Sequence, residues 1–173
     1  MKTIETTVCE FAELSESAKD KAREWYRDGA LDYDWWESTY EDAARIGLKI
    51  DGFGLDRDRH ATGHFTIPAA HVTERITKEH GESCETFKTA RAFVESCGAL
   101  DAKTPKDADG VPIDESAFDE AQDEQDAEFL RSLLEDYSIM LQHEMEWLLS
   151  NESVDETITA NGYTFTESGK RYG

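Results

Sequence analysis

The longest run of regularly spaced apolar residues lies within Ser116–Asn151. Its apolar positions are Phe129, Leu130, Leu133, Leu134, Tyr137, Met140, Leu141, Trp147 and Leu148. Steps of three and four residues place such side chains on one side of an α-helix. The pattern therefore predicts one long helix over residues 116–151, and it indicates that the last two-thirds of this helix packs against the rest of the protein.

The first third of the predicted helix is acidic most of the way round. Its carboxylates are Asp119, Glu120, Asp123, Glu124, Asp126 and Glu128, and no Lys or Arg stands among them. Phe118, Ala121 and two glutamines form the only edge without acidic side chains. Because the burial of unpaired carboxylates costs too much free energy, we expect this end of the helix to project from the body of the protein.

Shorter patterns predict the remaining elements. Strands are predicted at residues 2–11, 48–55 and 63–67, and residues 163–172 are predicted to hold a final short strand with a polar turn after it. Helices are predicted at residues 15–28, 34–47, 69–80 and 83–97. Ser15 is the expected N-cap of the first helix, and the last strand is expected to return beside residues 2–11. Residues 98–114 contain two of the three prolines and no periodicity, which is typical of a flexible loop. The predicted fold is α+β, a single domain over residues 1–173 with about five helices on one small antiparallel sheet.

Charge narrows the classes of partner. The chain has 39 Asp and Glu against 18 Lys and Arg, a formal net charge of −21. Residues 101–152 contribute −13 of this charge, with 16 acidic and 3 basic side chains. Direct binding of nucleic acid needs basic side chains that neutralise phosphates, and anionic membranes repel an acidic chain. We therefore expect no direct nucleic-acid binding and no membrane association, and we expect partners with basic surfaces.

Three cysteines, Cys9, Cys84 and Cys97, are too few for a disulfide framework and odd in number. The first residues lack the apolar segment of a secretory signal. No run approaches the roughly 18 apolar residues that a membrane-spanning helix requires. These features predict a cytoplasmic protein with reduced thiols.

The acidic first third of the long helix is the strongest candidate for a functional surface. Its six carboxylates, from Asp119 to Glu128, span about 14 Å of helix. Duplex DNA of the same length carries roughly eight phosphates. The similar charge density permits mimicry of a nucleic-acid backbone, and Glu135 and Asp136 would extend the surface. The alternative interpretation is a solvated helix face that only confers solubility.

An aromatic group offers a second candidate surface. Its members are Trp25, Tyr26, Trp35, Trp36 and Tyr40. Their helical spacing favours a core, but two neighbouring tryptophans cannot easily face inward together. Trp35 is therefore a candidate exposed anchor for a protein partner.

Patterns for metal binding and catalysis are weak. His60 and His64 follow Asp56 and Asp58, but the spacing matches no closed zinc site. The fragment DADG at 107–110 lacks the flanking ligands of a calcium loop, and no local signature surrounds a cysteine nucleophile. We therefore expect no metal, no cofactor and no enzymatic activity.

Three blocks of the chain carry a family resemblance: LSESAKDKAREWYRDG, DYDWWESTYEDAARIGLKI and the closing NGYTFTESGKRYG. They resemble small bacteriophage proteins often labelled "antitoxin of toxin–antitoxin stability system". The resemblance spans about half of the chain and contains no catalytic motif. Members of that group have a longer Gly-rich stretch where this chain has GFGLDRDRHATGHF. The resemblance implies a phage origin and a role in the host cytoplasm during infection.

The charge pattern and the resemblance together predict a phage-encoded inhibitor of a host defence system. Such an inhibitor, of the anti-CRISPR or anti-restriction type, would present its acidic surface to the basic nucleic-acid groove of a host protein. The alternative is an antitoxin or regulatory protein that neutralises a toxin through an aromatic surface. Salt distinguishes the two, because it weakens the first kind of binding more than the second.

Overall fold

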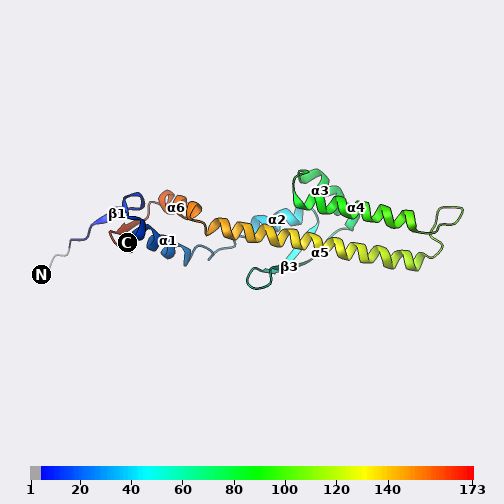
Figure 1. Ribbon diagram of the computed structural model, residues 1–173, viewed down its shortest axis with the longest axis horizontal. Helices are drawn as coiled ribbons and strands as arrows, with labels where there is room; N and C mark the ends of the chain where they lie inside the picture. The colour runs from blue at the N-terminus through cyan, green and yellow to red at the C-terminus, as the bar shows by residue number, and fades with distance from the viewer. Residues whose placement is uncertain (1–4) are drawn as a thin grey trace. The chain divides into compact units, whose positions relative to one another are not determined.

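The computed structural model describes residues 5–173, which divide into two compact units. The terminal unit combines the chain up to Trp35 with His143–Gly173, and the central unit comprises Trp36–Gln142. The predicted α+β class is confirmed, since 58% of the described residues are helical and 14% are in strands. Six α-helices and two small antiparallel sheets lie within residues 5–173 (Figure 1). None of the helices described there has both the length and the apolar composition needed to cross a membrane.

The terminal unit is built from segments at both ends of the chain. It contains β1 (Val8–Glu10), a 3₁₀ turn (Phe11–Glu13), α1 (Glu16–Arg27), α6 (Asn151–Ala160), β4 (Thr164–Thr166) and β5 (Arg171–Tyr172). The predicted return of the last strand is confirmed, because β4 pairs antiparallel with β1 and Cys9 lies opposite Phe165. Ser15 is the N-cap of α1, as predicted, and its hydroxyl accepts a hydrogen bond from the Ala18 amide.

A small core and an ion pair between α1 and α6 stabilise the terminal unit. The buried side chains are Phe11, Leu14, Ala18, Ala22, Val154, Ile158 and Phe165. Arg23 of α1 donates two hydrogen bonds to Asp155 of α6, at 2.6 and 2.7 Å. A bidentate guanidinium–carboxylate pair fixes orientation as well as distance, so it sets how these two helices pack.

The central unit contains α2 (Glu37–Arg45), β2 (Leu48–Gly54), β3 (His60–Phe65), α3 (Ala69–Glu79), α4 (Glu85–Lys103) and most of α5 (Glu115–Leu148). Its core includes Ile46, Leu48, Val72, Ile76, Phe93, Phe129, Leu133 and Tyr137. The predicted apolar stripe of the long helix is buried here from Phe129 to Leu141, but Met140 and Trp147 are exposed.

Two parts of the strand prediction need correction. Residues 48–54 and 60–65 form a separate two-stranded sheet and do not join β1, which pairs with β4 only. A period-two pattern identifies strands but does not choose their partners. The strand predicted for residues 2–11 is assigned only at Val8–Glu10, and residues 2–4 lie outside the described part of the chain.

The loop predicted for residues 98–114 begins later than expected, because α4 continues through Gly98 to Lys103. A glycine inside a helix costs only about 1 kcal/mol relative to alanine. Beyond Gly98, Leu100 lines a pocket of about 300 Å³ together with Pro105 and Phe118. The remaining turn is ordered by Asp107, whose carboxylate accepts hydrogen bonds from the amides of Asp109 and Val111.

The predicted long helix over residues 116–151 is present as α5, but it ends at Leu148. Ser150 then caps a new helix, α6, by accepting a hydrogen bond from the Ser153 amide. The apolar positions of the pattern also end at Leu148, so the predicted end at residue 151 was three residues too far. A serine at this position is a typical N-cap.

Candidate functional site

The acidic first third of α5 lies beside α4 (Figure 1). The ring of Phe129 stacks on Phe93 of α4, with 4.3 Å between centroids. One turn earlier, Gln125 exchanges two hydrogen bonds with Ser96, and before it Gln122 donates to the Cys97 sulfur at 3.4 Å. The edge without acidic side chains is therefore the contact with α4. The acidic end is half of a helical hairpin and is not a lone helix.

Four carboxylates on the outer sides of this hairpin have no cationic partner. Asp119, Glu120, Asp123 and Glu124 are exposed. Among residues 5–173, no Lys, Arg or His nitrogen lies within the 4.0 Å ion-pair distance of them. We call these four residues the free acidic group. Their charges are separated from the protein's own bases and are available to a partner.

The other predicted binding acids have internal partners. Asp126 accepts a hydrogen bond from Gln122 at 2.9 Å, and Glu128 pairs with Arg131 in the next turn. Glu135 pairs with Arg59 of the β2–β3 connection, which also bonds Ser138 and Gln142. These contacts stabilise the fold. The three side chains are therefore less available to a partner than those of the free acidic group.

Asp136 lies in a different environment from the exposed acids. Its carboxylate accepts a hydrogen bond of 2.6 Å from the Thr89 hydroxyl of α4. Burial raises the pKa of Asp136 above its ordinary value, although the Thr89 hydrogen bond opposes this. Asp136 therefore belongs to the contact between α4 and α5 rather than to an exposed surface.

Trp35 is buried, with 8% of its surface exposed, so it is not the exposed anchor that the sequence suggested. Trp35 lies in a turn before α2, and Trp36 is the N-cap residue of that helix. The prediction assumed that the two tryptophans are neighbours inside one helix, and it fails because both precede the first residue of α2. Trp36 is half-buried and meets Phe53 edge to face, with 5.7 Å between the ring centroids.

The histidines considered as metal ligands have separate local partners. His60 Nδ1 lies 2.7 Å from the Asp58 carbonyl oxygen, and His64 Nδ1 lies 3.1 Å from Asp51. Within the described chain no three His, Cys, Asp or Glu side chains come together as a metal site. The segment 107–110 is a turn closed by its own Asp107 carboxylate.

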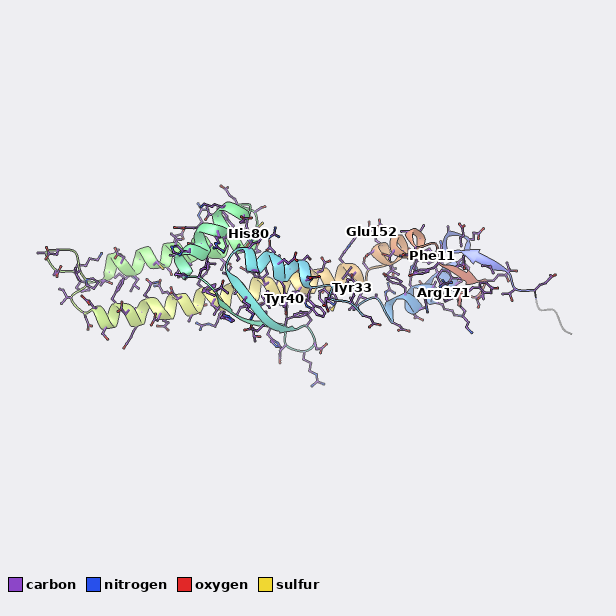
Figure 2. All side chains as sticks on the ribbon, turned by 180° about the vertical axis from the view of Figure 1, so that it is seen from behind. Phe11, Tyr33, Tyr40, His80, Glu152 and Arg171 are labelled. Carbon is purple, nitrogen blue, oxygen red and sulfur yellow. The ribbon has the colours of Figure 1, made fainter. Side chains whose placement is uncertain are left out.

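A partly buried polar network, which the sequence did not reveal, links four helical segments of the central unit. Tyr137 of α5 donates a hydrogen bond of 2.8 Å to Asp42 of α2. The same Asp42 oxygen lies 3.4 Å from His80 Nε2. His80 is the C-cap residue of α3 and is labelled in Figure 2. His80 Nδ1 lies 2.7 Å from the Thr86 hydroxyl of α4. The hydrogen bonds from His80 and Tyr137 hold the pKa of Asp42 below its ordinary value.

The order hydroxyl, histidine, carboxylate in this network matches a catalytic triad. The Thr86 residue, however, is only 3% exposed. A nucleophile must reach a substrate atom, and this hydroxyl is enclosed by packing. We therefore assign the network to structure: it sets the packing of α2, α3, α4 and α5.

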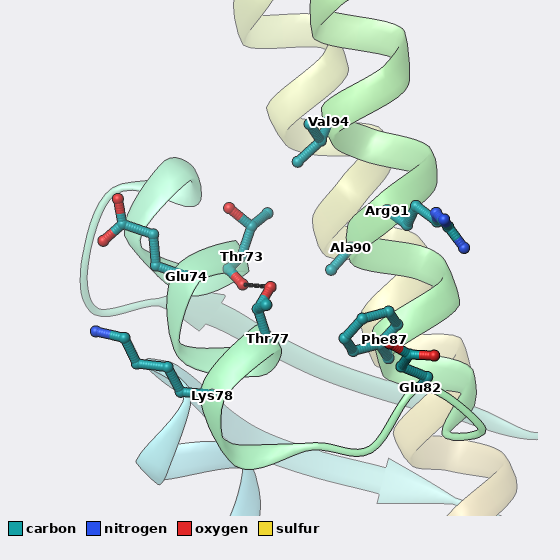
Figure 3. Close-up of a pocket in the computed structure, with 9 residues that line it drawn as sticks. All are labelled: Thr73, Glu74, Thr77, Lys78, Glu82, Phe87, Ala90, Arg91 and Val94. Carbon is teal, nitrogen blue, oxygen red and sulfur yellow. Dashed lines mark hydrogen bonds between the residues drawn. The ribbon is translucent and has the colours of Figure 1, made fainter.

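A groove runs between α3 and α4 (Figure 3). It has a volume of about 640 Å³, and Phe87, Ala90 and Val94 supply its apolar side. Lys78 and Arg91 line it together with Glu74 and Glu82, so its charges balance. Thr77 uses its hydroxyl to bond the Thr73 carbonyl oxygen of its own helix. Among the residues that line the groove, no nucleophile lies beside a base. The groove therefore has the features of a binding surface and not those of a catalytic site.

No protein-family model matches the chain, and neither does a curated protein or a solved structure.

Proposed function

We propose that this protein is a phage-encoded inhibitor of a host defence system that uses the acidic end of the α4–α5 hairpin to imitate DNA. Its target is a nucleic-acid-binding protein with a basic groove, such as a CRISPR effector or a restriction enzyme. The observation that carries the proposal is the free acidic group. Its four carboxylates stand along one and a half turns of helix with no internal cation.

Charge density supports the proposal. Residues 119–128 of α5 carry six carboxylates and no base, over about 14 Å of helix. A duplex of that length presents roughly eight phosphates. A groove that attracts one polyanion by long-range electrostatics attracts another of similar density.

Pairing with α4 adds a second argument. A frayed acidic tail would lose conformational freedom on binding, and that loss weakens affinity. Here Gln122 and Gln125 bond α4 from the opposite side of the helix. The free acidic group is therefore presented by a helix that is already formed before binding.

A phage role rests on the sequence resemblance alone, and the class of target rests on charge. Both are tested by expressing the protein in bacteria that carry a CRISPR or a restriction system. We expect phages that are normally blocked to form plaques on these cells. In cells that express the quadruple variant D119N/E120Q/D123N/E124Q, the defence system should block these phages again.

A matched control variant, E41Q/E74Q/E79Q/E156Q, removes four charges from exposed residues elsewhere. It should protect phages as well as the native protein does. Equal loss of protection in the two variants would show that net charge matters and that the position of the carboxylates does not. Full protection by D119N/E120Q/D123N/E124Q would exclude the acidic hairpin as the inhibitory surface.

The antitoxin alternative is supported by exposed aromatic side chains in the terminal unit. Trp25, Tyr33 and Tyr172 are 37%, 56% and 46% exposed. Aromatic anchors often dominate protein interfaces. In that case co-expression should rescue cells from a toxin, and binding should change little between low and high salt, because apolar contacts are not screened.

A further inference from the structure

The terminal unit contains a pocket whose charge is opposite to that of the whole chain. The pocket has a volume of about 510 Å³ and is lined by Lys21, Trp25, Ser168, Gly169, Lys170 and Arg171. Three of its six lining residues are cations, and none is Asp or Glu. In a chain of net charge −21, such a gathering of cations is the feature that most needs an explanation.

The cations of this pocket are not used in ion pairs. Within residues 5–173, no carboxylate lies within 4.0 Å of a nitrogen of Lys21, Lys170 or Arg171. Glu24 and Glu167 are close in sequence to the lining residues, but neither lines the pocket. The positive charge therefore remains available to an anion.

Arg171, labelled in Figure 2, is held by a hydrogen bond and by two aromatic rings. Its Nη1 donates a hydrogen bond of 2.9 Å to the Thr164 carbonyl oxygen. Its guanidinium carbon lies 5.6 Å from the Trp25 ring centroid and 5.0 Å from that of Tyr163. These cation–π contacts position the guanidinium before any ligand arrives, so less entropy is lost on binding.

The backbone at Gly169 brings the β4–β5 turn against α1. Gly169 has a positive φ of 83°, and a Cβ atom there would lie 2.1 Å from the Ala18 carbonyl oxygen. Only glycine permits this approach. It places Lys170 and Arg171 beside Lys21 and Trp25, which are one helical turn apart on α1. The pocket is thus built by close packing rather than by chance crowding of surface side chains.

We propose that this pocket binds a nucleoside phosphate, with the base against the exposed part of Trp25 and the phosphates between Lys21, Lys170 and Arg171. Lysine and arginine are common phosphate ligands, and aromatic side chains stack on bases of any sequence. The volume lies within the range of small-molecule sites. A long nucleic acid is disfavoured, because the net charge of the chain repels a polyanion.

The test uses the full-length protein and isothermal titration calorimetry with ATP. Divalent cations are left out, because the acidic hairpin would attract them. We expect saturable binding of one ATP per chain. Adenosine and inorganic tripolyphosphate should each bind at least about tenfold more weakly, because each lacks one of the two recognised parts.

Two matched double variants locate the site. K21Q/K170Q should weaken ATP binding at least about tenfold. K49Q/K78Q removes the same charge from exposed lysines of the central unit and should leave ATP affinity unchanged. Trp25→Ala should weaken ATP binding more than tripolyphosphate binding, because it removes the surface for the base but only one of the two rings that position Arg171. Thermal unfolding is the check on folding.

Three results would overturn the proposal. The first is an absence of saturable ATP binding at about 1 mM ligand. The second is equal weakening by the two lysine variants, which would mean a general charge effect. The third is tripolyphosphate binding as tight as that of ATP, which would remove the role of Trp25. None of these outcomes bears on the acidic hairpin, which lies in the other unit.

Discussion

The first third of α5 and its middle carry carboxylates in contrasting surroundings. Between Asp119 and Glu124 the four acidic side chains face solvent without a cation. Between Phe129 and Leu141 the two acidic side chains, Glu135 and Asp136, are bonded to Arg59 and Thr89. The same helix packs on α4 in both places. The difference shows that the carboxylates in the middle of α5 take part in contacts that stabilise the fold, whereas those in its first third form no ion pair within the described chain.

The contrast predicts that truncating a side chain in the middle of α5 lowers the free energy of unfolding. Phe129 is 2% exposed, stacks on Phe93 and lies 5.4 Å from the Phe65 ring centroid. Phe129→Ala should destabilise the protein by about 3–5 kcal/mol, because it leaves a cavity in the core. Urea unfolding measures this loss. A cost below about 1 kcal/mol would mean that the middle of α5 does not carry the core.

The polar network around Asp42 predicts the next largest effect. Asp42→Asn should cost about 1.5–3 kcal/mol at neutral pH, since it weakens charge-assisted bonds to His80 and Tyr137. The pKa of Asp42 is lower in the folded than in the unfolded chain. Its stabilising effect is therefore present above the unfolded pKa and is lost as pH falls through the folded pKa. The stability gap between native and variant protein should close in acid, and a gap that stays constant with pH would contradict this assignment.

Gly98 tests the helical continuity of the hairpin. It lies inside α4, and a Cβ atom there would meet nothing within 4 Å. Gly98→Ala should stabilise the protein by about 0.5–1 kcal/mol, because alanine loses less entropy in a helix. Thermal unfolding measures the gain. A loss of stability would instead favour the loop that the sequence suggested for this segment.

Asp136 should give the smallest effect, with a sign opposite to that of Asp42. Burial raises the pKa of Asp136 in the folded protein, so its ionised form opposes folding at neutral pH. Asp136→Asn should raise stability slightly at pH 7, while an asparagine oxygen still accepts the Thr89 hydrogen bond. Below the unfolded pKa the benefit should vanish, because both states are then protonated. An equal change in the free energy of unfolding at pH 7 and at pH 3 would contradict a raised pKa of Asp136.

Much of the fold was predictable because local signals and global packing agree. Ser15 marks the start of α1, and the spacing from Phe129 to Leu141 identifies the buried face of α5. Pairing was harder to predict: alternation does not state that β1 joins β4 while β2 and β3 form their own sheet. The predicted end of α5 lies three residues too far, because the prediction ran the helix through Ser150, which is the N-cap of α6.

The sequence predicted which residues make the candidate site acidic, but it did not predict which of them have partners elsewhere in the chain. Counting acids located the free acidic group, but it did not reveal that Glu135 and Asp136 have partners far away in sequence. The Asp42–His80–Tyr137 network gave no signal at all, since its members are up to 95 residues apart. The pocket around Arg171 depends on Gly169 approaching Ala18, and no periodicity encodes such a contact.

The most direct test of the central claim is competition for a DNA-binding groove. Once a host effector is known to be inhibited, its release of a labelled duplex is measured by fluorescence anisotropy against increasing protein at low and high salt. The native protein and E41Q/E74Q/E79Q/E156Q should displace the duplex at low salt and much less at high salt, whereas D119N/E120Q/D123N/E124Q should fail at both. Equal displacement by the two quadruple variants would contradict the account.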